Sequence, residues 1–169
     1  SEGISIYADN SSNSAIFFAD GTSGAATYTG QINYQHASDA MTFHTNGGTE
    51  RMRIDANGHI TMPTQSAFLA RPSSNQTDIA VGSDVTVVFG TEIFDQNADF
   101  SSNTFTAPVT GRYQLNFNVR LVQLDSAATY YYVQLNTSNR VYIAIFDPDF
   151  GQDNEHFFIA HSVLADMDA

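Results

Sequence analysis

Cysteine is absent from the 169 residues, which excludes disulfide scaffolds, thiolate zinc sites and cysteine nucleophiles together. Basic residues are scarce, because six Lys and Arg face 18 Asp and Glu and leave a formal net charge of -12. Such a surface repels nucleic acid and anionic lipid headgroups, so neither is an expected partner. No run approaches the roughly 18 consecutive apolar residues of a membrane span, and membrane insertion is not expected.

The chain still has enough apolar residues to fold, since 42% of it is hydrophobic and only 14% is charged. Its polarity comes mainly from Ser, Thr, Asn and Gln. Apolar residues do not recur at the three- and four-residue spacing of amphipathic helices. The sequence therefore predicts an all-β fold.

Residues 1–62 consist of short alternating runs separated by turn residues. The pairs Asn46-Gly47 and Asn57-Gly58 favour tight turns, because both residue types tolerate positive φ. A string of such short strands buries little apolar surface alone, so its aromatic faces are expected to meet equivalent faces on other chains. The predicted strands are 4–7, 15–18, 26–28, 31–34, 40–43 and 51–54.

A second region is expected at residues 63–169. Pro63 cannot donate to a strand ladder, and the composition changes after it. Residues 113–121 alternate strictly between apolar and polar side chains, which is typical of a strand with one buried face. Together these strands predict a β-sandwich or jelly roll. They are 67–71, 85–89, 104–107, 111–124, 129–136, 141–146 and 156–164.

The stretch Phe105-Thr106-Ala107-Pro108, followed by Gly111 and Tyr113, resembles the core signature of jelly rolls of the complement C1q and tumour-necrosis-factor type. The resemblance covers about 100 residues and implies a C1q/TNF-like head that works as a homotrimer. Similar heads continue through further strands, so the head within residues 63–169 is expected to be incomplete.

The first region resembles the shafts of bacteriophage tail fibres. The similarity lies in Gly30-Gln31-Ile32-Asn33-Tyr34, Thr45-Asn46-Gly47 and Glu50-Arg51-Met52-Arg53-Ile54. It implies an intertwined trimeric shaft over residues 1–62, located on a virion and therefore extracellular. The partners that it implies are two further copies of the chain and other virion tail proteins.

The acidic loop 147–155 places oxygen ligands on alternating residues, as calcium loops do. The four candidate ligands are Asp147, Asp149, Asp153 and Glu155. Gly151 comes one position early for an EF-hand, and Pro148 interrupts the loop. We therefore favour a solvated acidic loop, with calcium as the alternative and no other cofactor.

Tyr130, Tyr131 and Tyr132 are candidate contact residues, because in a strand the first and third share one face. Aromatic rings with polar tips suit a subunit interface, which we favour, or a sugar-stacking surface. The five histidines show no metal-binding spacing, and a strand surface or a subunit interface is their expected location. Three copies of one histidine around a three-fold axis are the alternative by which a metal could still be held. They are His36, His44, His59, His156 and His161.

No nucleophile elbow, phosphate loop or nucleotide fingerprint occurs, so the chain is not expected to be an enzyme. Carboxylate pairs for glycoside hydrolysis need only proximity in space, which leaves a hydrolase as a remaining alternative. The predicted function is a trimeric phage tail-fibre protein whose head contacts a glycan or protein of the bacterial surface. The alternatives are a purely structural neck or decoration fibre, and a secreted C1q-like recognition module.

Overall fold

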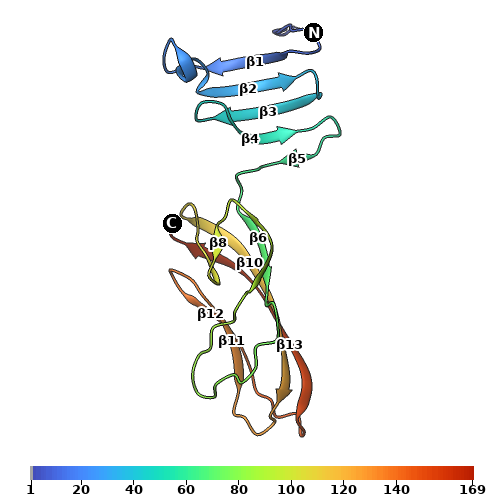
Figure 1. The fold of residues 1–169 in the computed structure, drawn as a ribbon, viewed down its shortest axis with the longest axis vertical. Coiled ribbons are helices and arrows are strands. Elements are labelled where there is room, and N and C mark those ends of the chain that lie inside the picture. Colours follow the sequence, from blue (N-terminus) through green and yellow to red (C-terminus); the bar gives the residue numbers. More distant parts are fainter. Residues whose placement is uncertain (1) are drawn as a thin grey trace. The chain divides into compact units, whose positions relative to one another are not determined.

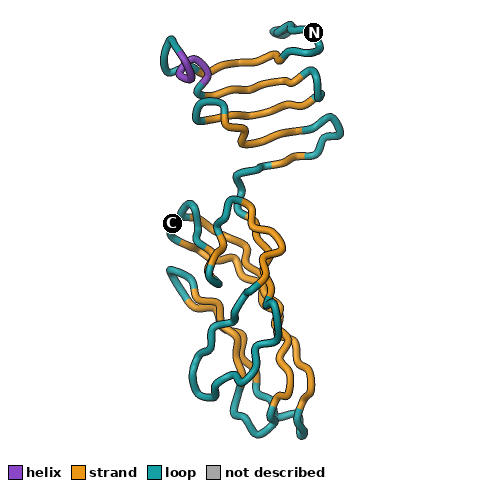
Figure 2. Tube along the Cα trace, viewed as in Figure 1, coloured by secondary structure: helices purple, strands orange, loops and turns teal. Residues whose placement is uncertain are grey.

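The computed structural model describes residues 2–169, and within this range it has thirteen strands and one short 3-10 helix (Figure 1). Figure 2 shows that strands and connecting loops make up nearly all of the chain. The predicted all-β class is therefore confirmed. The backbone contacts divide the chain into two compact units, one that ends at Ala98 and one that spans Asp99–Ala169. The predicted boundary after residue 62 follows the last strand of the first sheet.

The first unit contains a five-stranded antiparallel meander, in which each strand pairs with its neighbour in the sequence. Its strands are β1 (Asn13–Phe18), β2 (Gly30–Gln35), β3 (Ala40–Thr45), β4 (Thr49–Ile54) and β5 (Ile60–Thr61). The β3–β4 turn is Asn46-Gly47-Gly48, with φ values of 52°, 71° and 99°. The predicted Asn-Gly turn is thus present, because these residues accept the left-handed backbone that the turn requires.

The strand register places most of the apolar side chains on one face of this sheet and most of the polar side chains on the other. Ile32 lies opposite Ile16 and Phe43, and Phe43 lies opposite Met52. Because side chains alternate between faces, these residues share one face. A second row on the same face joins Tyr34, Met41, Ile54 and Ile60. We call these eight residues the apolar sheet face.

The opposite face is polar and internally hydrogen-bonded. A register shift between Phe43 and His44 places Glu50 opposite His44, and Glu50 then accepts two hydrogen bonds from Arg53, at 2.8 and 3.0 Å. Arg53 also donates to Gln35 Oε1 at 3.0 Å. The Arg53 guanidinium lowers the pKa of the Glu50 carboxyl, chiefly through this hydrogen bonding.

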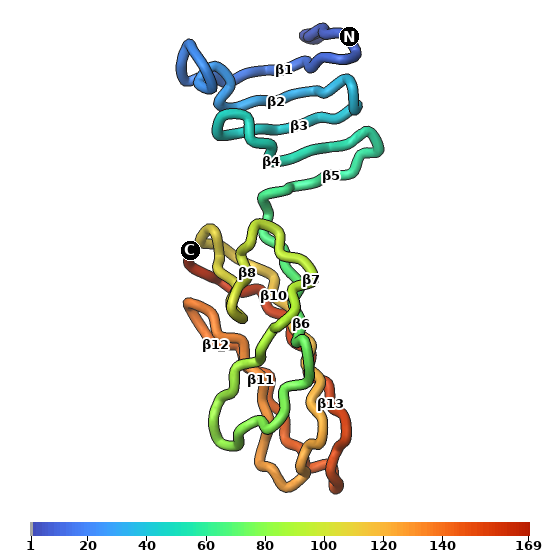
Figure 3. The backbone as a smooth tube through the Cα atoms, viewed as in Figure 1, coloured from blue at the N-terminus to red at the C-terminus, as the bar shows by residue number. Residues whose placement is uncertain are grey.

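A hairpin of β6 (Ala67–Arg71) and β7 (Thr91–Gln96) follows in the same unit. The Gln96 side chain donates to the carbonyls of Met62 and Gln65, at 3.0 and 2.6 Å, and so ties β7 to the segment after β5. The long loop 72–90 is the green trace between the two strands in Figure 3. Gln76 closes it by donating to Thr86 O at 2.9 Å and accepting from Val88 N at 3.0 Å.

The second unit is built on one long antiparallel pair, β10 (Gly111–Leu124) and β13 (Asn154–Met167). A hairpin of β11 (Tyr131–Asn136) and β12 (Val141–Phe146) lies between them in the sequence. The short strands β8 (Phe100–Ser101) and β9 (Thr104–Phe105) precede β10. The core cluster consists of Ala107, Val163, Ala165 and Met167, and is covered by Phe105, Tyr113, Leu115, Leu135 and Tyr142.

The Pro-Gly corner before β10 brings Phe105 against Tyr113. Their ring centroids are 5.2 Å apart at 65°, an edge-to-face contact, and the Tyr113 hydroxyl donates to Val109 O at 2.7 Å. The predicted burial of alternate residues in 113–121 is confirmed, since Tyr113, Leu115, Phe117, Val119 and Leu121 are less exposed than the residues between them. The all-β fold of this unit is clear, whereas a C1q/TNF-like jelly roll stays a prediction.

Three predicted strands are wrong. Residues 4–7 pair with no strand of the described chain, and Ser14 Oγ donates to Ile6 O at 2.9 Å. Residues 26–28 belong to the 3-10 helix η1 (Gly24–Tyr28), where Thr27 Oγ1 bonds locally to Gly24 O at 2.8 Å and competes with strand pairing. Residues 85–89 are irregular, because the Gln76 side chain takes the Val88 N–H that a ladder would use, and the strand begins later, in β7.

The core of the second unit makes a stability prediction. Ala165 is fully buried, at 0% exposure, whereas its neighbour Leu164 is 60% exposed. Ala165→Leu is expected to lower the free energy of unfolding by about 1–3 kcal/mol, because the cluster has no room for a larger side chain. The control Leu164→Ala should change it by less than about 0.5 kcal/mol. Urea unfolding at one protein concentration measures both, and equal losses would contradict this core assignment.

Candidate functional site

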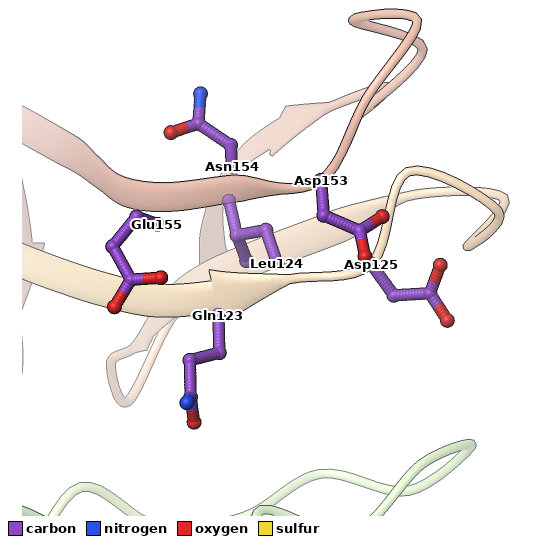
Figure 4. Close-up of a pocket in the computed structure, with 6 residues that line it drawn as sticks. All are labelled: Gln123, Leu124, Asp125, Asp153, Asn154 and Glu155. Atoms are coloured by element: carbon purple, nitrogen blue, oxygen red, sulfur yellow. The ribbon is translucent and has the colours of Figure 1, made fainter.

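Carboxylates gather where β10 ends and β13 begins, around an open hollow shown in Figure 4. Gln123 lies in this part of β10 with φ of 56°, in the left-handed region, and the next residue, Leu124, is buried. The carboxylates of Glu155 and Asp125 lie at opposite sides of the group and point away from each other. The lining residues are Gln123, Leu124, Asp125, Asp153, Asn154 and Glu155.

Hydrogen bonds from the loop between β10 and β11 engage two of these carboxylates. Asp153 Oδ1 accepts from the backbone N and the Oγ of Ser126, at 3.0 and 2.9 Å. These two bonds stabilise the ionised carboxylate and lower the pKa of Asp153, the backbone bond most. Asp125 Oδ1 accepts from Ala127 N at 2.8 Å. Both carboxylates therefore shape the loop that follows β10.

The four predicted calcium ligands do not lie together in the structure. Asp153 and Glu155 line the hollow, whereas Asp147 and Asp149 do not. Asp147 Oδ1 instead accepts from Asp149 N at 3.1 Å in a local turn. Within residues 2–169, no group of three or more His, Asp and Glu side chains is placed to hold a metal ion.

Sequence reasoning missed Gln123 and Asp125 in the hollow. They precede the acidic loop by more than twenty residues and come beside it only because Leu124 pairs with Asn154. Gln123 and Asp125 could be placed in the hollow only with the knowledge that β10 pairs with β13. A strand pattern shows which face is buried, but not which distant strand is its neighbour.

The three consecutive tyrosines divide between two sides. Tyr131 stacks on Phe146 at 5.7 Å, and its hydroxyl oxygen accepts from Asp125 N at 3.1 Å. Tyr130 and Tyr132 are 54% and 37% exposed, with ring centroids 6.0 Å apart. Tyr131 thus helps to hold the loop beside the hollow, while the other two form part of an outer surface.

This outer surface continues across β12. Tyr132 lies opposite Ile145, Gln134 opposite Ile143, and Asn136 opposite Val141. The three aliphatic residues are all exposed. The outer face of the β11–β12 hairpin therefore carries aromatic, aliphatic and amide side chains but no charge, which suits a protein contact.

The apolar sheet face is the second uncharged surface, and it belongs to the first unit. The strands β1–β5 form a single layer in Figure 1. Ile16 and Ile60 are exposed, and the other six residues are half-buried. A sheet with one apolar face normally packs that face against another layer.

A comparison with protein-family models finds no match, and comparisons with curated proteins and with solved structures find none either. Among the described residues, no helix is long and apolar enough to cross a membrane.

The acidic hollow makes a prediction about calcium. We expect the same melting temperature with excess calcium and with a chelator. The Glu155 and Asp125 carboxylates point apart, and those of Asp125 and Asp153 already accept hydrogen bonds from the loop between β10 and β11. Differential scanning calorimetry of the whole chain measures this. A rise in melting temperature with calcium that Asp153→Asn abolishes would instead establish the calcium loop, and Asp20→Asn serves as the control for charge.

Proposed function

We propose that this chain is a non-enzymatic structural and attachment protein of a bacteriophage tail fibre that works as a homotrimer. Residues 1–62 form the shaft, and residues 63–169 form a C1q/TNF-like head that contacts the surface of the host bacterium. The sequence resemblances in both regions support this proposal. The all-β fold and the uncharged exposed faces agree with it.

The main support for this proposal is the solvent-accessible surface area of the single chain. The chain exposes 11855 Å², whereas a compact monomer of 18.4 kDa exposes about 8,200 Å². Two separate globular domains of the sizes of the two units would together expose about 9,800 Å². A surplus of about 2,000 Å² therefore remains even when the units are counted separately.

The surplus area includes many large apolar side chains, such as Ile16, Ile60, Ile143 and Ile145. Exposed apolar side chains on both units favour contact with another protein chain. A trimeric fibre covers such surface between subunits. It also presents three linked heads, which raises the effective concentration of each weak host contact.

Solution mass tests the assembly. Multi-angle light scattering is expected to give three times the chain mass of 18.4 kDa over a range of concentrations. Apolar burial holds the copies together, so high salt should not dissociate the trimer. A well-folded particle with the mass of one chain would contradict the proposal and favour an isolated sandwich module.

Attachment is a separate expectation from assembly. The trimer should bind envelope polysaccharides or envelope proteins of particular bacteria on an array, with signal that falls when the trimers are printed at low density. An unrelated trimer of similar negative charge is the control for nonspecific adsorption. A stable trimer that binds no envelope component would favour a purely structural neck or decoration fibre.

A further inference from the structure

We propose that the apolar sheet face is the surface through which copies of this chain associate, and that the polar face of the same sheet stays in solvent. This inference rests on the proposed assembly, and it names the contact that the assembly uses. The partner is a second copy of the chain.

First, the two faces of the sheet differ in the polarity of their side chains. All eight residues of the apolar sheet face are uncharged, and seven of them are aliphatic, thioether or phenyl side chains. On the other face, His44 bonds to Thr42 Oγ1 at 2.9 Å and to Gly48 O at 2.8 Å, beside the Glu50 and Arg53 pair. Several polar groups of that face bond to one another, although the buried Asn33 Oδ1 on the same face has no hydrogen-bond partner among the described residues. Burial of the charged Glu50 and Arg53 pair in an interface would carry a desolvation cost.

The second step is area. Each subunit of a closed trimer has two neighbours and contributes to two interfaces. A standard interface buries about 800 Å² on each partner, so two of them need about 1,600 Å² from each chain. The surplus of about 2,000 Å² has this size for the whole chain, and the apolar sheet face is one part of the surface that a trimer would cover.

The third step is charge, which favours a second copy as the occupant. The chain carries a net charge of -12, so two copies repel each other through most of their surface. None of the eight residues of the apolar sheet face is charged, although the Tyr34 hydroxyl donates to the Asp39 carboxylate at 3.2 Å beside it. Contact through these eight residues therefore places few carboxylates against carboxylates. Three such sheets arranged around one axis can enclose a common apolar core, with face-to-face layers about 10 Å apart.

Adjacent residues of β1 provide a matched test. Ile16 is 48% exposed on the apolar sheet face, and Phe17 is 56% exposed on the opposite face, where it pairs with Gln31. Ile16→Asp is expected to weaken association about a hundredfold or more, because an unpaired carboxylate would be buried between copies. Phe17→Asp adds the same charge to the same strand and should leave the mass of the assembly unchanged.

Cysteine labelling provides a second readout that does not depend on dissociation. The chain has no native cysteine, so single substitutions report one position each. Ile60 is 57% exposed in the single chain, nearly the same as Phe17. In the wild-type assembly, Ile60→Cys should react with maleimide at least about tenfold more slowly than Phe17→Cys, because another copy covers it. Urea-unfolded protein should label equally at both positions.

The outcomes separate this inference from the proposed function. A wild-type chain with the mass of one copy overturns both. A wild-type trimer in which Ile16→Asp still assembles and Ile60→Cys labels as fast as Phe17→Cys overturns only the assignment of the face. Dissociation by Phe17→Asp alone would assign the contact to the polar face. Circular dichroism of each variant confirms that the sheet is intact.

Discussion

The antiparallel register of the five-stranded meander is the constraint on which the first unit depends. Because side chains alternate strictly along a strand, the pairing of Ile32 with Ile16 and Phe43 aligns the apolar residues of successive strands in rows. A slip of one residue would mix Arg53 and Glu50 with these rows. The register shift beside His44 preserves the separation, since it places Glu50 on the side of Arg53. A single sheet layer with one apolar face needs a second layer to cover that face.

The second unit depends on a longer pairing of the same kind. The β10–β13 ladder runs from Gly111 opposite Met167 to Leu124 opposite Asn154. It supplies two of the five residues that cover the core cluster, Tyr113 and Leu115. The β11–β12 hairpin adds Leu135 and Tyr142 from a second two-stranded sheet. Its inner side is therefore committed to the core, while its outer side leaves Ile143 and Ile145 exposed. The sheet of the first unit and the β11–β12 hairpin of the second therefore each expose one uncharged face.

The local sequence pattern was sufficient to predict elements whose structure depends only on residues close to them in the sequence. The Asn46-Gly47 turn, the alternation in 113–121 and the strand at β12 could all be predicted from short windows. The strand expected at 26–28 failed because Thr27 bonds to Gly24 O, and the one at 85–89 failed because Gln76 takes the Val88 N–H. The hollow was only half predicted, since Asp125 reaches Asp153 through a long-range ladder that no short window contains.

The charge distribution explains how uncovered apolar faces are compatible with a specific assembly. A net charge of -12 on 169 residues raises the energy of any close approach between copies, and this repulsion opposes indiscriminate aggregation. The proposed association is then confined to surfaces where the free energy gained by apolar burial exceeds the repulsion. The apolar sheet face meets this condition because its rows hold no carboxylate, whereas Phe17 on the other face lies near Glu50 and His44 through Gln31. In the proposed assembly, repulsion over most of the surface contributes to specificity as much as attraction on one face.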